Sequence, residues 1–527
     1  MYSHQIRYMW EKAMKSLFKT VALITIFSVL TRVLGFLFRI FLSRVVGAEA
    51  LGIYQVAFSV FMVLLTIISS GLPLIISRMS ATFLANKEGK KESSLISVSL
   101  IYSLVLSIVL CVLVLIFKNA FSLFFTDNRC IQILIVLLPS LIFSSVYSAV
   151  RGALWGRGNY FALCVSELYE QVVRIVLSVL VLSTGLSVIE NALNVAWTMT
   201  FACFLSMIFV ILLFFYYGGK FGKAKKEMLK PLVRQSTPIT LMRVAGSFVQ
   251  PLIAVVIPAR LMVIGYTSSQ AMSLYGIAVG MTMPLLFVPT TLIGSLSTAL
   301  IPDISTALAQ NNQQHINSRV NSSISFALFI SALFVPVFLS MGEQMGIFLY
   351  DNIMSGTLLQ SASWVLIPMG LTNISSALLN SLGLEKKSFF NYVIGSAVMF
   401  VALWILPQLL GINALVWGMG INYLITGILN LRLLKKKTKV QLNLLGTIGK
   451  YIVVILPTSA LTAFIISLCE YVFPLFVSLF IGGVVSVVAF LLLSGVMNLI
   501  DIKAFIVKAV EKVKLPKLKL NKSNSKH

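Results

Sequence analysis

Fourteen long apolar stretches follow one another along this chain, and they limit what it can fold into. A helix needs about 20 residues to cross the hydrocarbon core of a bilayer. We therefore expect each stretch to be one membrane-spanning helix. The stretches cover residues 20–43, 52–77, 94–117, 131–150, 161–183, 191–217, 236–258, 271–300, 320–341, 358–382, 389–409, 412–431, 447–468 and 472–499.

The composition agrees with a chain that lies almost wholly in a membrane. Of its 527 residues, 58% are hydrophobic and only 11% are charged, and the mean hydropathy is +0.97. A soluble globular domain does not have this composition. The fold class we predict is an all-α polytopic protein of the cell membrane, with both termini on the same side because the number of spans is even.

Lysine and arginine are unevenly distributed over the connections between these stretches. Every second connection, together with both ends of the chain, holds most of the 41 basic residues. This asymmetry is typical of the positive-inside rule and predicts that both termini are cytoplasmic. The net charge of +25 then reflects topology and contact with anionic membrane lipids, and we expect no nucleic-acid partner. The intervening connections carry Arg44, Lys118, Arg129 and Arg260.

Short internal similarities divide the chain into two related halves. Tyr54-Gln55-Val56-Ala57 matches Tyr275-Gly276-Ile277-Ala278, and Asn191-Ala192-Leu193 matches Asn413-Ala414-Leu415. Because the copies begin on the same side, they predict two six-helix lobes related by a pseudo-two-fold axis along the membrane normal, followed by two extra helices. The predicted parts are an N-terminal lobe (1–217), a basic cytoplasmic linker (218–235), a C-terminal lobe (236–440), the last two helices (441–499) and a basic cytoplasmic tail (500–527).

The stretch 271–300 contains helix breakers in its interior. Proline lacks an amide hydrogen, so within a helix it removes a backbone hydrogen bond and often kinks the chain. Pro284, Pro289 and Gly294 therefore predict a bend that would serve opening and closing.

Several charged and polar residues lie inside the apolar stretches. Arg32 and Arg39 are two helical turns apart and share one face. A charge near the bilayer centre costs at least about 2.5–3.5 kcal/mol, so it usually faces protein or water. Polar residues of the stretch 161–183 recur with helical spacing, and the stretch 236–258 adds more. We expect one substrate cavity lined by Arg32, Arg39, Arg174, Arg243, Arg260, Glu167, Glu170, Gln171 and Gln250.

Such a cavity would favour an anion. Its arginines outnumber its glutamates, and the planar guanidinium binds phosphate through two hydrogen bonds at once. Two other interpretations stay open: Glu170 and Arg174, four residues apart, form a helix-stabilising pair, and Arg39 and Arg260 extend to the outer surface.

Nothing in the sequence indicates an enzyme, a cofactor or a metal site. A glycine-rich phosphate loop with a following lysine is absent, which argues against an ATP-driven pump. The three histidines lie at the termini or in a polar loop. A membrane-embedded glycosyl polymerase would need acids in a sizeable outer loop. The largest outer loops, around 118–130, 259–270 and 342–357, are short and offer only Asp127, Glu343 and Asp351.

Motifs spread along the whole chain resemble one known family, the stage V sporulation protein B group. That group belongs to the polysaccharide-transporter branch of the flippase superfamily, which also holds the multidrug and toxin extrusion transporters and the lipid II flippases. The resemblance is carried by Thr31-Arg32-Val33-Leu34-Gly35-Phe36, Gly47-Ala48-Glu49-Ala50-Leu51-Gly52-Ile53-Tyr54-Gln55, Gly71-Leu72-Pro73, Arg151-Gly152-Ala153-Leu154-Trp155-Gly156, Tyr169-Glu170-Gln171-Val172-Val173-Arg174 and Pro302-Asp303-Ile304-Ser305.

The resemblance implies two six-helix lobes that move an undecaprenyl-pyrophosphate-linked sugar across the membrane by alternating access. The sugar would be a peptidoglycan precursor or another polysaccharide unit, with a role in spore cortex formation. Arginines serve the pyrophosphate in related flippases; Arg32 and Arg39 match them by position, and Arg243 and Arg260 match loosely. The stretch 52–77 lacks the arginine that some lipid II flippases have there.

The resemblance also bears on partners and on the alternative function. Coupling to a monovalent cation or to the membrane potential, and a cell-wall polymerase partner, would fit a flippase. The alternative is a cation-coupled multidrug exporter, which would require an acidic cavity dominated by Glu167 and Glu170.

Overall fold

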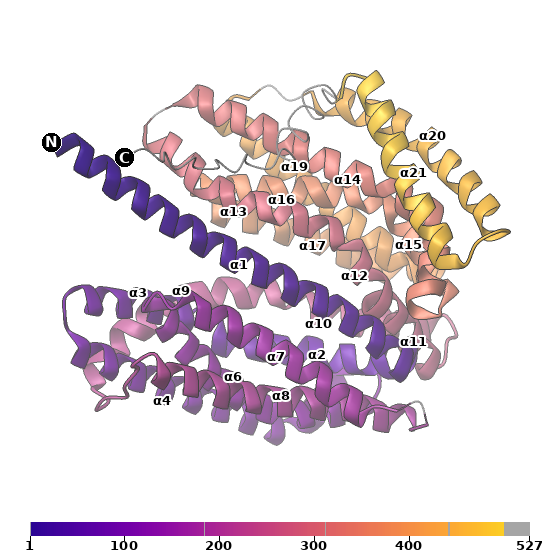
Figure 1. Cartoon of the computed structure of the whole chain (residues 1–527). Helices are drawn as coiled ribbons and strands as arrows, with labels where there is room; N and C mark the ends of the chain where they lie inside the picture. The colour runs from indigo at the N-terminus through magenta and orange to yellow at the C-terminus, as the bar shows by residue number, and fades with distance from the viewer. Residues whose placement is uncertain (1, 184, 311, 441–442, 500–527) are drawn as a thin grey trace, which may run out of the picture. The chain divides into compact units, whose positions relative to one another are not determined.

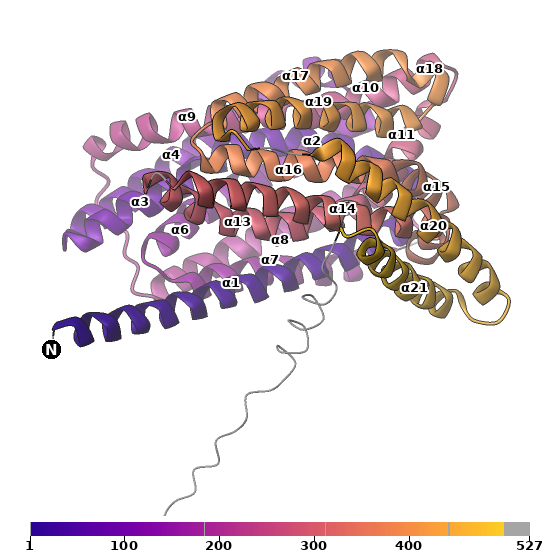
Figure 2. The same ribbon diagram turned by 90° about the horizontal axis from the view of Figure 1, so that it is seen from above.

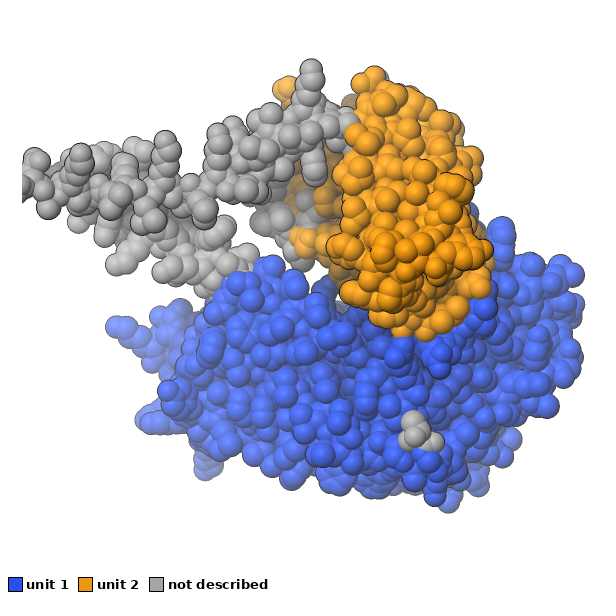
Figure 3. Space-filling view, turned by 45° about the vertical axis from the view of Figure 1, so that its right-hand side comes forward, with its two compact units in different colours: residues 1–287, 349–358, 389–426 blue, residues 288–348, 359–388, 427–527 orange. Residues whose placement is uncertain are grey.

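The chain folds into helices that group into two compact units (Figures 1 and 3). The computed structural model describes residues 2–183, 185–310, 312–440 and 443–499, so the predicted tail 500–527 lies outside the described residues. Unit 1 comprises residues 1–287, 349–358 and 389–426, and unit 2 comprises residues 288–348, 359–388 and 427–527. The lobe boundaries expected from the internal repeat stay a prediction.

Unit 1 holds the N-terminal helices in chain order, joined by α18 and by parts of α17 and α19. Its elements are α1 (Tyr2–Val46), α2 (Ala48–Ser69), α3 (Leu72–Ala85), α4 (Gly89–Ile116), α5 (Lys118–Phe124), α6 (Arg129–Gly156), α7 (Tyr160–Val181), α8 (Val188–Tyr216), η1 (Lys226–Met228), α9 (Leu229–Ser247), α10 (Val249–Val263), α11 (Ser268–Tyr275), the π-helix η2 (Gly276–Thr282), α12 (Met283–Leu286), α17 (Glu385–Ile405), α18 (Pro407–Leu410) and α19 (Asn413–Thr438).

Unit 2 contains the remaining helices. Four helices are divided between the units: α14, whose last residues Leu349 and Tyr350 belong to unit 1, α15 (Ile353–Ala362), α17 and α19. In this unit α13 packs on α16, and α20 and α21 form a pair of neighbouring helices, as Figures 1 and 2 show. Its elements are α13 (Val288–Ala309), α14 (Gln313–Tyr350), η3 (Ser363–Val365), α16 (Leu366–Ser381), α20 (Leu444–Glu470) and α21 (Leu475–Val496).

Every predicted span overlaps one observed helix or a run of consecutive helices. Among the described residues, 12 helices are long and apolar enough to cross a membrane, or 13 if Ser268–Leu286 and Val288–Ser295 count as one bent span. The expected break in the stretch 271–300 is therefore found, with the interruption at Phe287. The polar helix α7 is not among the 12, and the count of fourteen stays a prediction.

Helix α6 is the centre of unit 1 and packs against α2, α3, α4, α7 and α8. Two glycines on its last turns let it approach α3 closely. A Cβ on Gly152 would lie 2.8 Å from the Cα of Pro73, and one on Gly156 would lie 2.6 Å from the Ser77 carbonyl oxygen. Small residues four apart favour such backbone contact between membrane helices, because packing in lipid gains little from the hydrophobic effect.

A second close contact joins α2 to α11 and η2. A Cβ on Gly52 would overlap the Met272 carbonyl oxygen, and a Cβ on Gly276 would overlap the Ala48 carbonyl oxygen. The two helices therefore meet backbone to backbone. Tyr54 and Tyr275, the matched tyrosines of the repeat, are both buried beside this contact.

An ion-pair cluster lies at the start of α2, α6 and α11. The Arg129 guanidinium donates to Glu49 at 2.7 Å and to Asp127 at 2.8 Å, and the Ser268 hydroxyl donates to Asp127 at 2.9 Å. Burial alone would raise the pKa of Asp127, but hydrogen bonds from Arg129 and Ser268 outweigh it and lower this pKa. Three connections far apart in the sequence are thus tied together.

We expect Gly52→Ala to lower the apparent melting temperature of the purified protein in detergent. The added Cβ forces α2 and α11 apart, and overpacking of this kind costs about 1–3 kcal/mol. Gly483→Ala is the matched control, because its Cβ would enter open space and alanine is the better helix former. Equal melting temperatures for the two variants would contradict the contact.

We also expect the Asp127 carboxylate to make stability depend on pH. Because its folded pKa is lowered, its contribution is present above the ordinary aspartate value of about 3.9 and is lost as the pH falls through the folded value. The melting-temperature gap between the parent and Asp127→Asn should therefore shrink from pH 7 to pH 3. Exposed Asp351→Asn should show no such gap at either pH.

Candidate functional site

Helix α1 presents its two arginines beside α7. Both Arg32 and Arg39 are exposed, and α1 packs against α7. Between them, Gly35 faces the Gln171 amide, where a Cβ would make an ordinary contact at 3.6 Å. Gln171 itself is buried. The predicted polar faces of these two helices thus meet in the structure.

Helices α6 and α7 neutralise each other's charges. Arg151 of α6 forms an ion pair with Glu167 of α7, and Arg174 pairs with Glu170 one turn away on the same helix. The guanidinium of Arg151 also lies 6.0 Å from the ring centre of Tyr147. Both glutamates therefore have a basic partner, and the interpretation of Glu170–Arg174 as a pair four residues apart agrees with the geometry.

A cavity of about 520 Å³ opens among α1, α2, α3, α6, α7 and α8. Glu167, Glu170 and Arg151 line it together with hydroxyl and thiol groups, including those of Ser148 and Cys203. The predicted acidic residues Glu167 and Glu170 thus line a cavity, and this cavity lies within unit 1. Its charged residues are paired, so the cavity does not carry the strong positive excess that we expected from the sequence alone.

Arg39 lies in a second polar environment at the other end of α7. It interacts electrostatically with Tyr350, Tyr54 and Arg174. Tyr54 and Tyr350 are buried, and the Tyr350 hydroxyl and the Arg174 Nε have no hydrogen-bond partner among the described residues. Nearby, the Arg44 Nε donates to the Leu349 carbonyl at 2.8 Å and ties α1 to the end of α14. This cluster therefore holds two buried donors without a hydrogen-bond partner among the described residues.

The three predicted site residues of α9 and α10 either contact other residues or are exposed. Arg243 donates to the Ser70 carbonyl at 2.7 Å, at the end of α2. The Arg260 guanidinium lies 4.7 Å from the ring centre of Trp404 on α17, and its Nε is buried without a partner among the described residues. Gln250 is exposed on α10. Their role in substrate binding stays a prediction.

Arg151 is the site residue that the sequence analysis missed. The predicted span 131–150 ends one residue too early and leaves Arg151 in a connection, whereas α6 continues to Gly156. A signal was present: Ser144, Tyr147, Ser148 and Arg151 recur at i, i+3, i+4 and i+7, the same spacing as the polar stripe of α7.

A family model decides the relationship of this chain. The model described as "Polysaccharide biosynthesis protein" matches residues 17–308, more than half of the sequence. The chain belongs to the polysaccharide biosynthesis protein family.

Two curated relatives are similar to this family member over most of their length. Stage V sporulation protein B of Bacillus subtilis (strain 168) is 26% identical over 383 residues, which cover 70% of this chain and 73% of the relative. Lipid II flippase MurJ of the same organism is 21% identical over 495 residues, covering 86% and 88%. The predicted resemblance to the sporulation protein B group is confirmed.

Solved structures show the same fold for this member of the polysaccharide biosynthesis family. Lipid II flippase MurJ in an inward closed conformation matches with a TM-score of 0.67 at 16% identity, covering 90% of this chain and 98% of that chain. A multidrug resistance MATE family transporter in an inward-facing conformation gives a TM-score of 0.66 at 17% identity, covering 78% and 94%. The all-helical multi-pass membrane fold is therefore confirmed.

We expect reversal of one charge in the α6–α7 pair to destabilise the protein and reversal of both to restore it. Arg151→Glu places a third carboxylate beside Glu167 and Glu170, and like charges at close range repel. Arg151→Glu combined with Glu167→Arg restores opposite charges. Folded yield and melting temperature in detergent measure this. A double variant as unstable as the single one would show that pairing is not what holds α6 to α7.

Proposed function

We propose that this protein is a flippase that moves an undecaprenyl-pyrophosphate-linked sugar across the cell membrane by alternating access. The observation that carries the proposal is the Arg39 cluster, where Arg39 is within electrostatic range of Arg174 and of the buried Tyr54 and Tyr350. The Tyr350 hydroxyl and the Arg174 Nε keep unused donors there. Donors grouped around cationic charge suit a pyrophosphate, because each guanidinium can hold two of its oxygens.

The balance of charge supports the same reading. Glu167 and Glu170 are paired with arginines, whereas Arg32 and Arg39 have no acidic partner among the described residues. Among these residues, the positive charge that has no acidic partner therefore lies on α1. The relatives named as a flippase of lipid II and as a sporulation protein fit a lipid-linked cell-wall precursor as cargo and a role in spore cortex formation.

A cation-coupled multidrug exporter is the second candidate, because a MATE family transporter shares the fold. A cationic drug would need unpaired carboxylates. The pairing of Glu167 with Arg151 and of Glu170 with Arg174 leaves little negative charge for that purpose. The flippase is therefore the better supported of the two.

The orientation and energy source belong to the same proposal. The basic connections support cytoplasmic termini, which would put the Glu49–Asp127–Arg129 cluster at the outer face. Transport would be driven by a monovalent cation or by the membrane potential, and a cell-wall polymerase would receive the product. The two six-helix lobes of the repeat would be the moving parts.

We expect Arg39→Gln to slow translocation of an undecaprenyl-pyrophosphate-linked sugar in proteoliposomes. Loss of a hydrogen bond to a charged group costs about 1.5–3 kcal/mol, so the rate should fall roughly 10- to 100-fold. Arg39→Lys should recover only part of it, because a lysine lacks the planar fork. Arg32→Gln should also reduce the rate. The measurement is protection of a labelled lipid from an external quencher.

Lys118→Gln is the control, since it removes one exposed positive charge outside the site. Full transport by an Arg32→Gln/Arg39→Gln double variant would contradict the proposal. Failure to translocate any lipid-pyrophosphate sugar, combined with raised resistance to cationic dyes in cells that overproduce the protein, would favour the multidrug exporter instead.

A further inference from the structure

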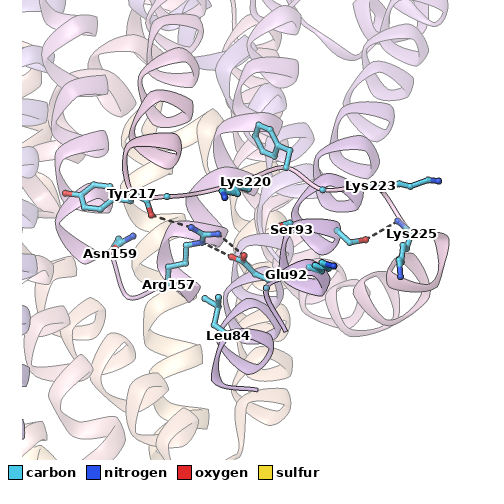
Figure 4. Close-up of a pocket in the computed structure, with 15 residues that line it drawn as sticks. Leu84, Glu92, Ser93, Arg157, Asn159, Tyr217, Lys220, Lys223 and Lys225 are labelled. Carbon is cyan, nitrogen blue, oxygen red and sulfur yellow. Dashed lines mark hydrogen bonds and ion pairs between the residues drawn. The ribbon is translucent and has the colours of Figure 1, made fainter. Parts of the chain in front are cut away.

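A larger cavity, of about 880 Å³, lies at the opposite end of unit 1 from the ion-pair cluster of α2 and α11. It is bounded by the end of α3, the first turns of α4, the α6–α7 connection and the segment that follows α8 (Figure 4). None of its lining residues belongs to the 520 Å³ cavity. The two cavities come near each other where α6 meets α7: Trp155 and Tyr160 line the smaller one, and Arg157 and Asn159 line the larger one.

A buried ion pair forms the frame of this cavity. The Arg157 Nε and the second guanidinium nitrogen both lie 2.7 Å from the Glu92 carboxylate oxygens, and the Ser80 hydroxyl donates to the same carboxylate at 3.0 Å. Glu92 is 1% exposed. The Arg157 guanidinium also stacks on Phe214, 5.2 Å from its ring centre. Figure 4 shows Arg157 and Glu92 pointing toward each other in the middle of the site.

The segment after α8 is fastened across the start of α4. The Gly222 amide donates to the Ser93 carbonyl at 3.2 Å and to the Ser97 hydroxyl at 3.1 Å. The Lys225 amide donates to the Ser94 hydroxyl at 3.1 Å. A Cβ on Gly222 would lie 2.9 Å from that of Ser93, so this approach needs glycine. The lysines of the segment are therefore carried on a fixed backbone.

The cavity has a strong excess of positive charge. Lys90, Lys220, Lys223 and Lys225 line it, and all four are exposed. Glu92 is the one acidic residue of the lining, and Arg157 already neutralises it. Four like charges held around one hollow repel one another, and an anion bound between them would relieve this repulsion.

Aromatic side chains place the cavity at the edge of the membrane-spanning region. The spanning helix α8 ends at Tyr216, and Tyr216, Phe215 and Phe221 are all exposed. Tyrosine and other aromatic rings are enriched at the level of the lipid headgroups. Tyr217 and Phe221 line the cavity itself, so its lysines lie where phosphates of a bilayer would be.

We propose that this cavity is a binding site for a phosphate-bearing anion, separate from the transport site. Its interfacial position favours the headgroup of an anionic phospholipid, and a free polyphosphate shares the same chemistry. A bound phosphate would hold the segment 217–225 on α4. The proposal does not depend on what the protein transports, because binding is measured without transport.

The test uses the full-length protein in neutral detergent and follows thermal unfolding against added short-chain phosphatidylglycerol, phosphatidylcholine or inorganic pyrophosphate. Phosphatidylglycerol should raise the melting temperature to a plateau, and phosphatidylcholine should not. Lys220→Gln/Lys223→Gln/Lys225→Gln keeps the backbone contacts and should need roughly 10- to 100-fold more ligand, since each interfacial lysine contributes. Lys435→Gln/Lys436→Gln/Lys437→Gln removes the same charge from the end of α19 and should bind like the parent.

The pattern of outcomes identifies the source of the phosphate. Saturation by phosphatidylglycerol alone assigns the site to a lipid headgroup, and saturation by pyrophosphate alone, lost in the first triple variant, assigns it to a soluble phosphate. Equal affinity of the two triple variants would overturn the site, as would absence of any saturable effect in the parent. Far-ultraviolet circular dichroism checks that both variants are folded.

Discussion

Ionised side chains inside an apolar helix bundle need an opposite charge, a polar group or water to face them. An unpaired buried charge costs several kcal/mol, and its partner must therefore be in place when the helices pack. Helix α7 brings Glu167, Glu170 and Arg174, and α6 supplies Arg151. This pairing fixes how α7 is rotated on α6, and with it turns Gln171 toward Gly35 of α1. The position of the two α1 arginines thus depends on the ion pair between α6 and α7.

Much of the architecture could be predicted from the sequence, because long apolar stretches and basic connections are local signals. The polar stripe of α7 could also be identified from its spacing, and in the structure α7 packs against α1. The partner of Glu167 was not predicted, because the apolar run of α6 ends before Arg151 although the helix goes on. The end of an apolar run marks where lipid contact ends. It does not show whether the helix continues into polar surroundings.

Contacts between residues far apart in the sequence could not be predicted from such local signals. Nothing in the residues around Arg260 indicates that it stacks on Trp404, and nothing near Arg243 indicates the Ser70 carbonyl. The glycine contacts are similar: Gly52 and Gly276 are visible as small residues, but their mutual approach depends on where two helices cross. Contacts of this kind hold membrane helices together through close packing, since lipid offers no hydrophobic driving force.

The fastening of Gly222 and Lys225 onto α4 has a mechanical consequence for the chain that follows. Helix α8 ends at Tyr216 and α9 begins at Leu229, which suggests a slack tether between two parts of the molecule. Because the amides of Gly222 and Lys225 are bonded to α4, the only part of the connection between this anchor and α9 is the turn Lys226–Met228. The chain between this anchor and α9 is therefore one short turn, so the start of α9 can move only a short distance away from α4 while these contacts hold.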